Sequence, residues 1–159
     1  MRWVKMNTDG AVKVDKTLAG CGGIISSHKG EWVAGFISNL TYCHSTQAEL
    51  MGILKGLEMA WSLEIRRLEV EADSKDVIES INDTHQDSTC HNYILKQIRS
   101  YKDRSWQITF NHIFREANKC ANWLANEGTK SGNGFTFFDI SPPGLQKIIL
   151  DDASGVSLS

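Results

Sequence analysis

The feature of the sequence that most constrains its fold is the order in which two hydrophobic periods appear. Three strand-like segments come first, at residues 4–9, 19–27 and 32–37. A turn at 28–31 is short enough to join the last two strands as an antiparallel hairpin. Apolar side chains then recur every three or four positions from Leu50 to Trp61, which predicts an amphipathic helix.

The second half of the chain alternates between the two periods. The pattern predicts strands at 67–73 and 106–113 and helices at 74–81, 93–101 and 117–127. The segment Ser45–Glu49 has the form of a capping box at the start of the long helix, and Gly128 stands where a C-cap glycine is expected. A meander of strands followed by alternating helices and strands predicts an α/β fold with a mixed sheet covered by helices.

The chain is expected to contain one domain at residues 1–130 and an irregular C-terminal tail at 131–159. A length of 159 residues with 41% hydrophobic and 23% charged residues suits a single globular domain. From Ser131 onward the composition shifts to Gly, Ser, Asp and Pro, and Pro142-Pro143 interrupts regular structure. We expect the tail to lie against the domain through its phenylalanines.

Composition and charge exclude several classes of protein. No run of eighteen apolar residues is present, so we expect no membrane partner, and the N-terminus lacks the apolar stretch of a signal peptide. The four cysteines are scattered without a C-x-x-C pair, which favours reduced thiols of an intracellular protein, nuclear or cytoplasmic. We expect a monomer. The net charge of −2 means that any nucleic-acid site relies on a local basic patch or on metal ions.

Three acidic residues stand at the ends of predicted elements. Asp9 ends the first strand, Glu49 lies in the first turn of the long helix, and Asp73 ends the fourth strand. If strands one and four are neighbours, the two aspartates lie side by side and the helix can aim Glu49 at both. Two carboxylates about 4 Å apart repel by roughly 4 kcal/mol at an effective dielectric constant near 20. A divalent cation removes this cost, and oxygen ligands favour Mg²⁺ or Mn²⁺.

Each acid also has a purely structural interpretation. Asp9-Gly10 is a common turn pair, Glu49 can complete a capping box, and Asp73 can cap the helix that follows it. Spacing alone leaves these alternatives open.

The sequence motifs around the acids resemble those of the ribonuclease H family in order and spacing. They are residues 7–11 (NTDGA), 19–25 (AGCGGII), 45–50 (STQAEL), 71–74 (EADS) and 112–125 (HIFREANKCANWLA). The wording is most similar to the reverse-transcriptase-like ribonuclease H domains of plant genomes, many of them derived from non-LTR retroelements, and residues 142–157 also look like the end of such proteins.

This resemblance implies a fold and an activity. The fold is a five-stranded mixed sheet, with strands 1–3 antiparallel and strands 4 and 5 parallel, flanked by helices. The activity is two-metal hydrolysis of the RNA strand of an RNA–DNA hybrid, with Mg²⁺ or Mn²⁺ as cofactor. Carried over by position, Asp9, Glu49 and Asp73 are metal ligands, and Asp9 bridges both ions.

The fourth carboxylate of the family falls at Asn122, where the chain departs from the pattern. An asparagine keeps an oxygen ligand but loses a full negative charge. Three explanations stay open: a weakened enzyme, a non-catalytic hybrid-binding domain, or an introduced replacement of a natural aspartate. A structural interpretation also exists, in which Asn122 is a polar helix residue one turn after Asn118.

Other functional residues are softer inferences from the same resemblance. Because the loop before the last helix is short, the histidine of bacterial-type relatives is absent, His112 is expected to be structural, and Arg115 is the candidate to reach the scissile phosphate. The candidate substrate contacts are Gly10, Ser45, Thr46 and Ser74. No basic handle is evident between residues 83 and 92, so we expect modest, salt-sensitive affinity for the hybrid.

Three hypotheses follow from these residues. The leading one is a metal-dependent endoribonuclease acting on RNA–DNA hybrids, motivated by the three acids. The alternative is a binding domain on the same fold, motivated by Asn122. The third is an expressed retroelement relic with neither activity.

Overall fold

A computed structural model of the protein describes residues 2–83 and 92–153. Its strands are β1 (Val4–Lys13), β2 (Leu18–Ser26), β3 (Trp32–Leu40), β4 (Arg67–Ala72), β5 (Gln107–His112) and β6 (Phe135–Phe138). Its α-helices are α1 (Ser45–Ser62), α2 (Lys75–Asn82), α3 (Asn92–Lys102), α4 (Lys119–Lys130) and α5 (Gln146–Ala153). Two 3₁₀ turns, η1 (Val14–Lys16) and η2 (Arg115–Ala117), follow β1 and β5.

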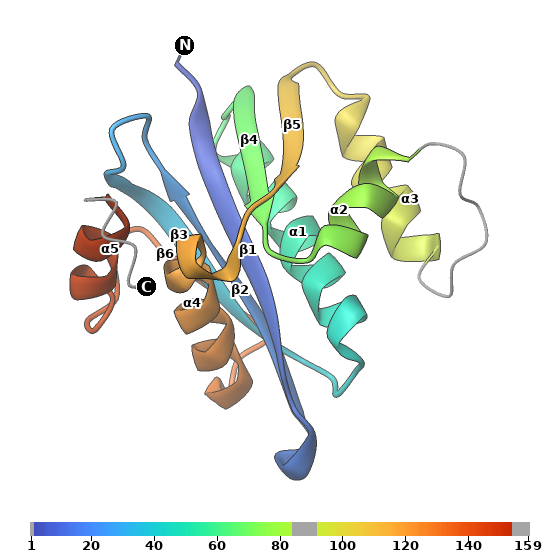
Figure 1. Ribbon diagram of the computed structural model, residues 1–159, viewed down its shortest axis with the longest axis vertical. Coiled ribbons are helices and arrows are strands. Elements are labelled where there is room, and N and C mark those ends of the chain that lie inside the picture. The colour runs from blue at the N-terminus through green and yellow to red at the C-terminus, as the bar shows by residue number, and fades with distance from the viewer. Residues whose placement is uncertain (1, 84–91, 154–159) are drawn as a thin grey trace.

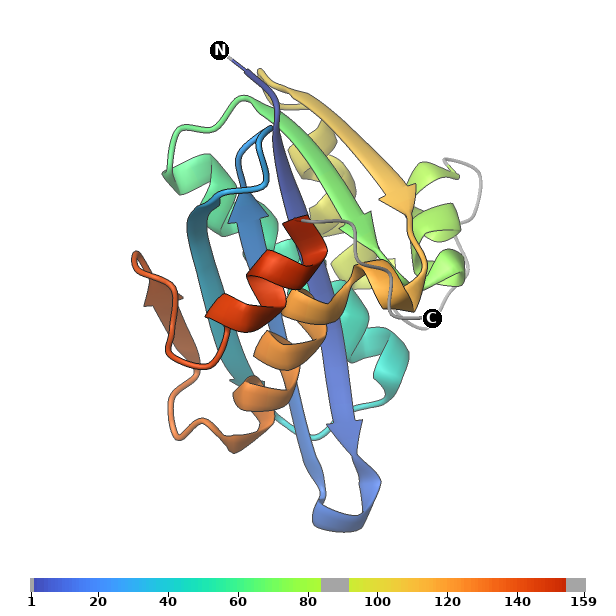
Figure 2. The same ribbon diagram turned by 60° about the vertical axis from the view of Figure 1, so that its left-hand side comes forward.

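One mixed sheet organises the molecule, with strand order β5-β4-β1-β2-β3-β6. The strands β1, β2, β3 and β6 pair antiparallel in succession, whereas β4 pairs parallel with β1 and with β5. Helices α1, α2 and α3 lie on one face of the sheet, and α4 and α5 lie on the other (Figures 1 and 2). The predicted α/β class and the arrangement of strands 1–5 are confirmed.

The sheet has six strands rather than the expected five, and the segment after residue 130, expected to be irregular, contains the strand β6 and the helix α5. The alternation of Phe135, Thr136 and Phe137 extends the sheet beyond β3, with Phe36 opposite Phe137. Leu145 is fully buried and packs with Ile24 and Leu124 beneath α5. Contacts with residues distant in the sequence stabilise the short apolar stretches of this segment. Its Gly- and Pro-rich composition does not indicate these contacts. The proposed boundary at residue 130 stays a prediction, and residues 154–159 lie outside the described part.

The first strand also runs further than expected. β1 continues to Lys13 because its pairing with β2 extends to Lys13 opposite Leu18, so Asp9-Gly10 lies within the strand and is not a turn. The residues before and after Asp9 are therefore both paired with β2, which fixes the backbone at Asp9.

Gly128 is not a C-cap glycine, because α4 continues to Lys130. Its missing side chain lets α4 lie directly on the sheet: a Cβ there would stand 2.8 Å from the backbone oxygens of Cys21 and Ser38. The reason for glycine is therefore close packing of helix on sheet. The capping box is also absent, since the N-cap residue of α1 is His44 and no side chain caps the helix.

The main core lies between the sheet and α1, and a second cluster lies under α4 and α5. Cys21 and Cys43 are free thiols, as expected, and Cys90 lies outside the described residues. Within residues 2–83 and 92–153, no helix combines the length and apolarity needed to cross a bilayer.

Replacing Gly128 by alanine tests the close packing of α4. A methyl group forced against two backbone oxygens is expected to lower the free energy of unfolding by about 2 kcal/mol. An open helical position would instead gain roughly 1 kcal/mol from the same change. Urea denaturation measures the difference. The control is Gly132→Ala, which meets no atom within 4 Å and should shift stability by less than about 0.5 kcal/mol. A stabilised Gly128→Ala protein contradicts the packing.

Replacing Leu145 by alanine tests whether the C-terminal segment belongs to the folded unit. Loss of this fully buried side chain should cost about 3 kcal/mol of unfolding free energy. The exposed Ile140 provides the control, since its side chain is 80% accessible and Ile140→Ala should be nearly neutral. Equal, small effects in thermal denaturation would mean that the segment does not stabilise the domain.

Candidate metal centre

The parallel pairing of β1 and β4 brings two aspartates together. Asn7 on β1 stands opposite Glu71 on β4. Two residues further along both strands, the same register places Asp9 beside Asp73, the first residue after β4. Because side chains alternate along a strand, this step of two keeps both carboxylates on the same face.

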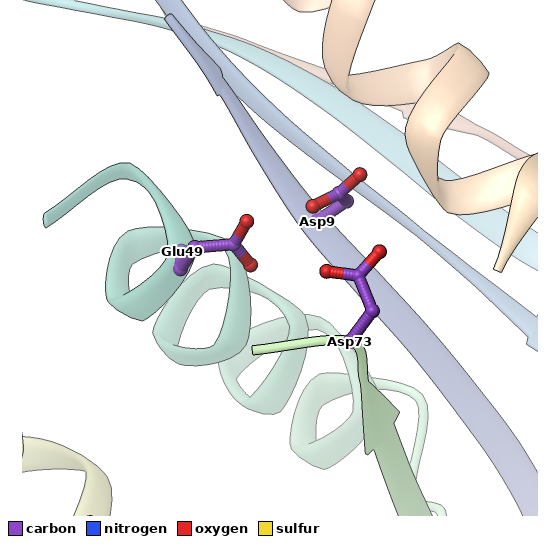
Figure 3. Close-up of side chains that lie close together, drawn as sticks. All are labelled: Asp9, Glu49 and Asp73. Atoms are coloured by element: carbon purple, nitrogen blue, oxygen red, sulfur yellow. The ribbon is translucent and has the colours of Figure 1, made fainter. Parts of the chain in front are cut away.

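Helix α1 supplies the third acid. A Cβ on Gly10 would lie 2.4 Å from the carbonyl carbon of Ala48, so only glycine allows the first turns of α1 to lie directly on β1. This contact directs Glu49 at the two aspartates (Figure 3). One carboxylate oxygen from each of Asp9, Glu49 and Asp73 lies within 4.8 Å of the others. The predicted convergence of the three acids is therefore present.

Crowding and burial make the three acids costly to ionise together. Burial is the main cause that raises the pKa of Glu49 to about 10, and its hydrogen bond with Asp9 and the charges of Asp9 and Asp73 add to the rise. Burial, followed by the charge of Asp9, also raises the pKa of Asp73. A hydrogen bond from Asn118 and the charges of Arg115 and His112 act against that second rise.

The donor set fits a hard divalent cation. Glu49 Oε2 and Asp73 Oδ2 are buried without a hydrogen-bond partner, although buried oxygens are normally bonded. A cation between the carboxylates would satisfy these oxygens and cancel their repulsion, and an all-oxygen site suits Mg²⁺ or Mn²⁺. The expected ligands Asp9, Glu49 and Asp73 therefore form a candidate metal centre.

A buried asparagine that the sequence interpretation did not assign to the site links its two strands. Asn118, 1% exposed at the start of α4, donates from Nδ2 to the backbone oxygen of Thr8 over 3.0 Å. Its Oδ1 accepts a hydrogen bond of 3.1 Å from Asn7, which also donates to Glu71. Through these bonds Asn118 joins α4 to β1, and Asn7 joins β1 to Glu71 on β4. The sequence signal that could have indicated this hydrogen-bond network is Asn7, a polar residue two positions before Asp9 and on the same face of β1.

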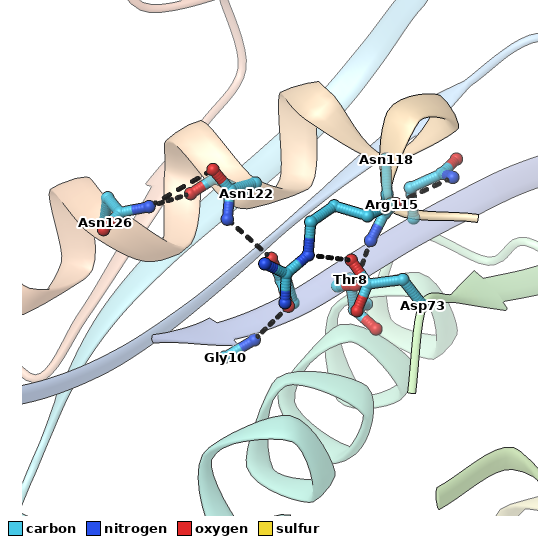
Figure 4. Close-up of polar contacts among 9 residues, drawn as sticks. Thr8, Gly10, Asp73, Arg115, Asn118, Asn122 and Asn126 are labelled. Carbon is cyan, nitrogen blue, oxygen red and sulfur yellow. Dashed lines mark hydrogen bonds and ion pairs between the residues drawn. The ribbon is translucent and has the colours of Figure 1, made fainter. Parts of the chain in front are cut away.

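Asn122 and Arg115 both lie at the acidic cluster (Figure 4). Asn122 Nδ2 donates to Asp9 Oδ2 over 3.1 Å, so the amide nitrogen faces the site where an oxygen ligand was expected. Arg115 Nε is 4.0 Å from Asp73 Oδ2, and its side chain is 84% exposed. The guanidinium therefore stands at the solvent side of the cluster and pairs with Asp73 rather than with Glu116. His112 is exposed and lies edge-on to Phe114, with ring centroids 5.7 Å apart.

The expected substrate contacts lie within four residues of one of the three acids in the sequence, but they differ in exposure. Ser45 and Thr46 are exposed in the first turn of α1, and Ser74 is the half-buried N-cap residue of α2. The Cβ position of Gly10 is filled by α1, so close packing requires glycine there, and the expected substrate contact of its backbone stays a prediction.

The raised pKa of Glu49 predicts a pH-dependent stability of the metal-free protein. The folded carboxyl binds a proton that the unfolded chain, with a pKa of 4.5, releases earlier. The corresponding stabilisation is complete below pH 4.5 and is lost as the pH rises toward the folded value of about 10. Unfolding free energy should therefore fall from about pH 6 to about pH 8, by at most about 1.4 kcal/mol per pH unit.

Chemical denaturation in the presence of a chelator measures this slope. Glu49→Gln cannot ionise and should flatten it, and saturating Mg²⁺ should do the same to the unchanged protein by holding Glu49 ionised. An equal slope for Glu49→Gln and the unchanged protein contradicts the assignment.

Comparison with known proteins agrees with the fold. The domain of a Mycobacterium tuberculosis protein described as its N-terminal RNase H domain superposes with a TM-score of 0.73 at 21% identity, over 82% of this chain and 95% of that chain. RNase H1 of Halobacterium salinarum superposes with a TM-score of 0.69 at 22% identity, over 80% and 98%. LC11-RNase H1, determined in complex with an RNA/DNA hybrid, gives 0.71 at 22%, over 80% and 96%.

Sequence comparison identifies the family. A protein of Arabidopsis thaliana, named as a candidate ribonuclease H protein, is 33% identical over 153 residues, which are 96% of this chain. The chain spans 25% of the length of that relative. Residues 7–128 match the Reverse transcriptase-like family, and this range contains all three acids as well as Asn122. The chain therefore belongs to the reverse-transcriptase-like family and has the ribonuclease H fold.

Proposed function

We propose that the protein is a metal-dependent endoribonuclease that hydrolyses the RNA strand of RNA–DNA hybrids. The observation that carries the proposal is the set of three carboxylates with oxygens within 4.8 Å of one another. Two of these residues, Glu49 and Asp73, each have a buried carboxylate oxygen without a hydrogen-bond partner. The complex of the similarly folded LC11-RNase H1 with an RNA/DNA hybrid supports the choice of substrate.

The three acids would hold the cations. Asp9 lies on β1, which pairs with β4 and packs against α1, so it would hold a cation together with both Asp73 and Glu49. Bound Mg²⁺, or Mn²⁺ in its place, would supply the positive charge that activates water and stabilises the leaving oxygen. With Asn122 in place of a fourth carboxylate, the site has one negative charge less, so we expect the second ion to bind more weakly.

The chain's own groups hold the acids and the substrate in position. Asp9 Oδ1 accepts a hydrogen bond of 2.9 Å from the backbone N–H of Gly10, and its Oδ2 accepts one from Asn122, which fixes the carboxylate plane. We expect Arg115, which is exposed and lies beside Asp73, to pair with the phosphate that is cut. In the reaction a water oxygen bonds to phosphorus, the bond from phosphorus to the 3′ oxygen breaks, and that oxygen takes up a proton, leaving 3′-hydroxyl and 5′-phosphate ends.

Substrate recognition would use groups around the start of α1. Ser45 and Thr46 are exposed, and no side chain caps the start of this helix. Hydroxyls and the N–H groups of a helix N-terminus suit phosphate and 2′-hydroxyl contacts. Ser74 and the backbone at Gly10 border the same cluster and complete the proposed contact set. Such contacts recognise the shape of the hybrid with little dependence on its base sequence.

A second candidate function is a hybrid-binding domain without catalysis. The specific observation in its favour is Asn122, whose amide nitrogen, and not an oxygen, faces Asp9. The fold and the exposed α1 end would be retained, while metal binding would be too weak for turnover.

Cleavage of a labelled RNA–DNA hybrid in Mg²⁺ or Mn²⁺ separates these functions. Asn122→Asp restores a charged ligand and should raise the cleavage rate by roughly tenfold or more, which corresponds to about 1.4 kcal/mol in the barrier. Asp73→Asn should abolish cleavage. The control Asp76→Asn changes an exposed acid in the first turn of α2 and should leave the rate unchanged.

The other outcomes are equally informative. Hybrid binding without cleavage by either the unchanged protein or Asn122→Asp would favour the binding domain. Loss of both cleavage and hybrid binding in these two proteins would contradict the proposal and favour a relic.

A further inference from the structure

Three asparagines lie one turn apart at the start and along one side of α4. Asn118, Asn122 and Asn126 follow at intervals of four residues, which places them on the same helix face. The first two contact β1, whereas Asn126 contacts Asn122 (Figure 4). The metal-centre chemistry described above gives no role to Asn126.

The orientation of the Asn126 amide follows from its contact with the backbone carbonyl of Asn122, which can only accept a hydrogen bond. Asn126 Nδ2 lies 2.8 Å from the backbone oxygen of Asn122. A backbone carbonyl can only accept, so the amino group of Asn126, and not its carbonyl, must face it. The same amino group lies 3.4 Å from Asn122 Oδ1, at the long end of a hydrogen bond.

The orientation of Asn122 follows in turn. With its carbonyl toward the amino group of Asn126, its own amino group faces Asp9 Oδ2 at 3.1 Å. The opposite rotation of the Asn122 amide would place amino group against amino group on one side and oxygen against carboxylate oxygen on the other. Both of these contacts are repulsive, so the two neighbours select one orientation.

We infer that Asn126 is a positioning residue that holds Asn122 as a hydrogen-bond donor to Asp9, so that the fourth position of the metal centre offers an N–H group instead of a ligand oxygen. The inference rests on the proposed function, because it describes how this metal centre differs from one with four acidic ligands. Asn122 then stabilises the Asp9 carboxylate in place, and the cation is held by three carboxylates.

The orientation itself can be tested without metal. In the ¹⁵N-labelled, metal-free protein, the side-chain amide protons of Asn122 should be well separated in chemical shift, with the proton facing Asp9 slow to exchange. Asn126→Leu keeps a similar shape without a donor and should bring these signals toward those of a free amide. The Gln97→Leu control replaces a half-buried amide on α3 and should leave them unchanged. Unaltered Asn122 signals in Asn126→Leu overturn the inference.

The consequence for metal binding is measured by calorimetric titration with Mn²⁺. Once released, the Asn122 amide can turn its oxygen to the cation, so Asn126→Leu should bind Mn²⁺ about two- to fivefold more tightly, the effect of one neutral hydrogen bond. The gain should vanish when the same change is made in Asn122→Ala. An equal gain in both backgrounds, or a loss of affinity, overturns the inference. Asn126→Ala is a second variant for the same comparison, and thermal unfolding verifies that each variant is folded.

Failure of the proposed function gives a different result. If no variant binds Mn²⁺, the metal-dependent nuclease is refuted, whereas the amide signals of the metal-free protein still decide whether Asn126 orients Asn122.

Discussion

The mutual repulsion of three carboxylates is the constraint on which the site depends. The parallel register of β1 and β4 places Asp9 beside Asp73, and the contact of α1 with β1 at Gly10 adds Glu49. The three acids come from separate parts of the fold, on β1, in the first turns of α1 and directly after β4, so packing holds their backbones near one another. The fold therefore retains a proton on Glu49, whose pKa burial raises to about 10, or gains a cation. Such a group of carboxylates favours binding of a divalent ion, whose charge offsets their repulsion.

Close packing of helices on the sheet is what keeps the acids together. Gly10 admits α1 on one face, and Gly128 admits α4 on the other. Asn118 then joins α4 to β1 by side-chain hydrogen bonds with Thr8 and Asn7, and Asn7 joins β1 to Glu71 on β4. The C-terminal β6 extends the sheet beyond β3, and α5 packs beside α4 (Figure 2). Architecture and site are consequently supported by the same contacts, since a shift of either helix would separate the carboxylates or release Asn122.

Much of the fold and the central part of the site could be predicted from the sequence. Hydrophobic period located β1–β5 and the helices α1 to α4. The placement of Asp9, Glu49 and Asp73 near the ends of such elements allowed their convergence, and the resemblance of the surrounding motifs to the ribonuclease H family favoured it. What failed depends on contacts between distant residues. The pairing of Lys13 with Leu18 turned an apparent Asp9-Gly10 turn into strand, and packing against Cys21 turned an apparent cap at Gly128 into a helix interior. Neither the orientation of Asn122 nor the burial of Leu145 leaves a local pattern in the chain.

The metal centre is tested most directly by a crystal structure of the protein soaked with Mn²⁺, with the ion located by its anomalous scattering. We expect density between β1, the start of α1 and the end of β4, with oxygens of Asp9, Glu49 and Asp73 at bonding distance and Asn122 turned with its nitrogen to Asp9. Binding of Mn²⁺ only elsewhere, or three carboxylates left without an ion at saturating Mn²⁺, would contradict the proposed metal centre.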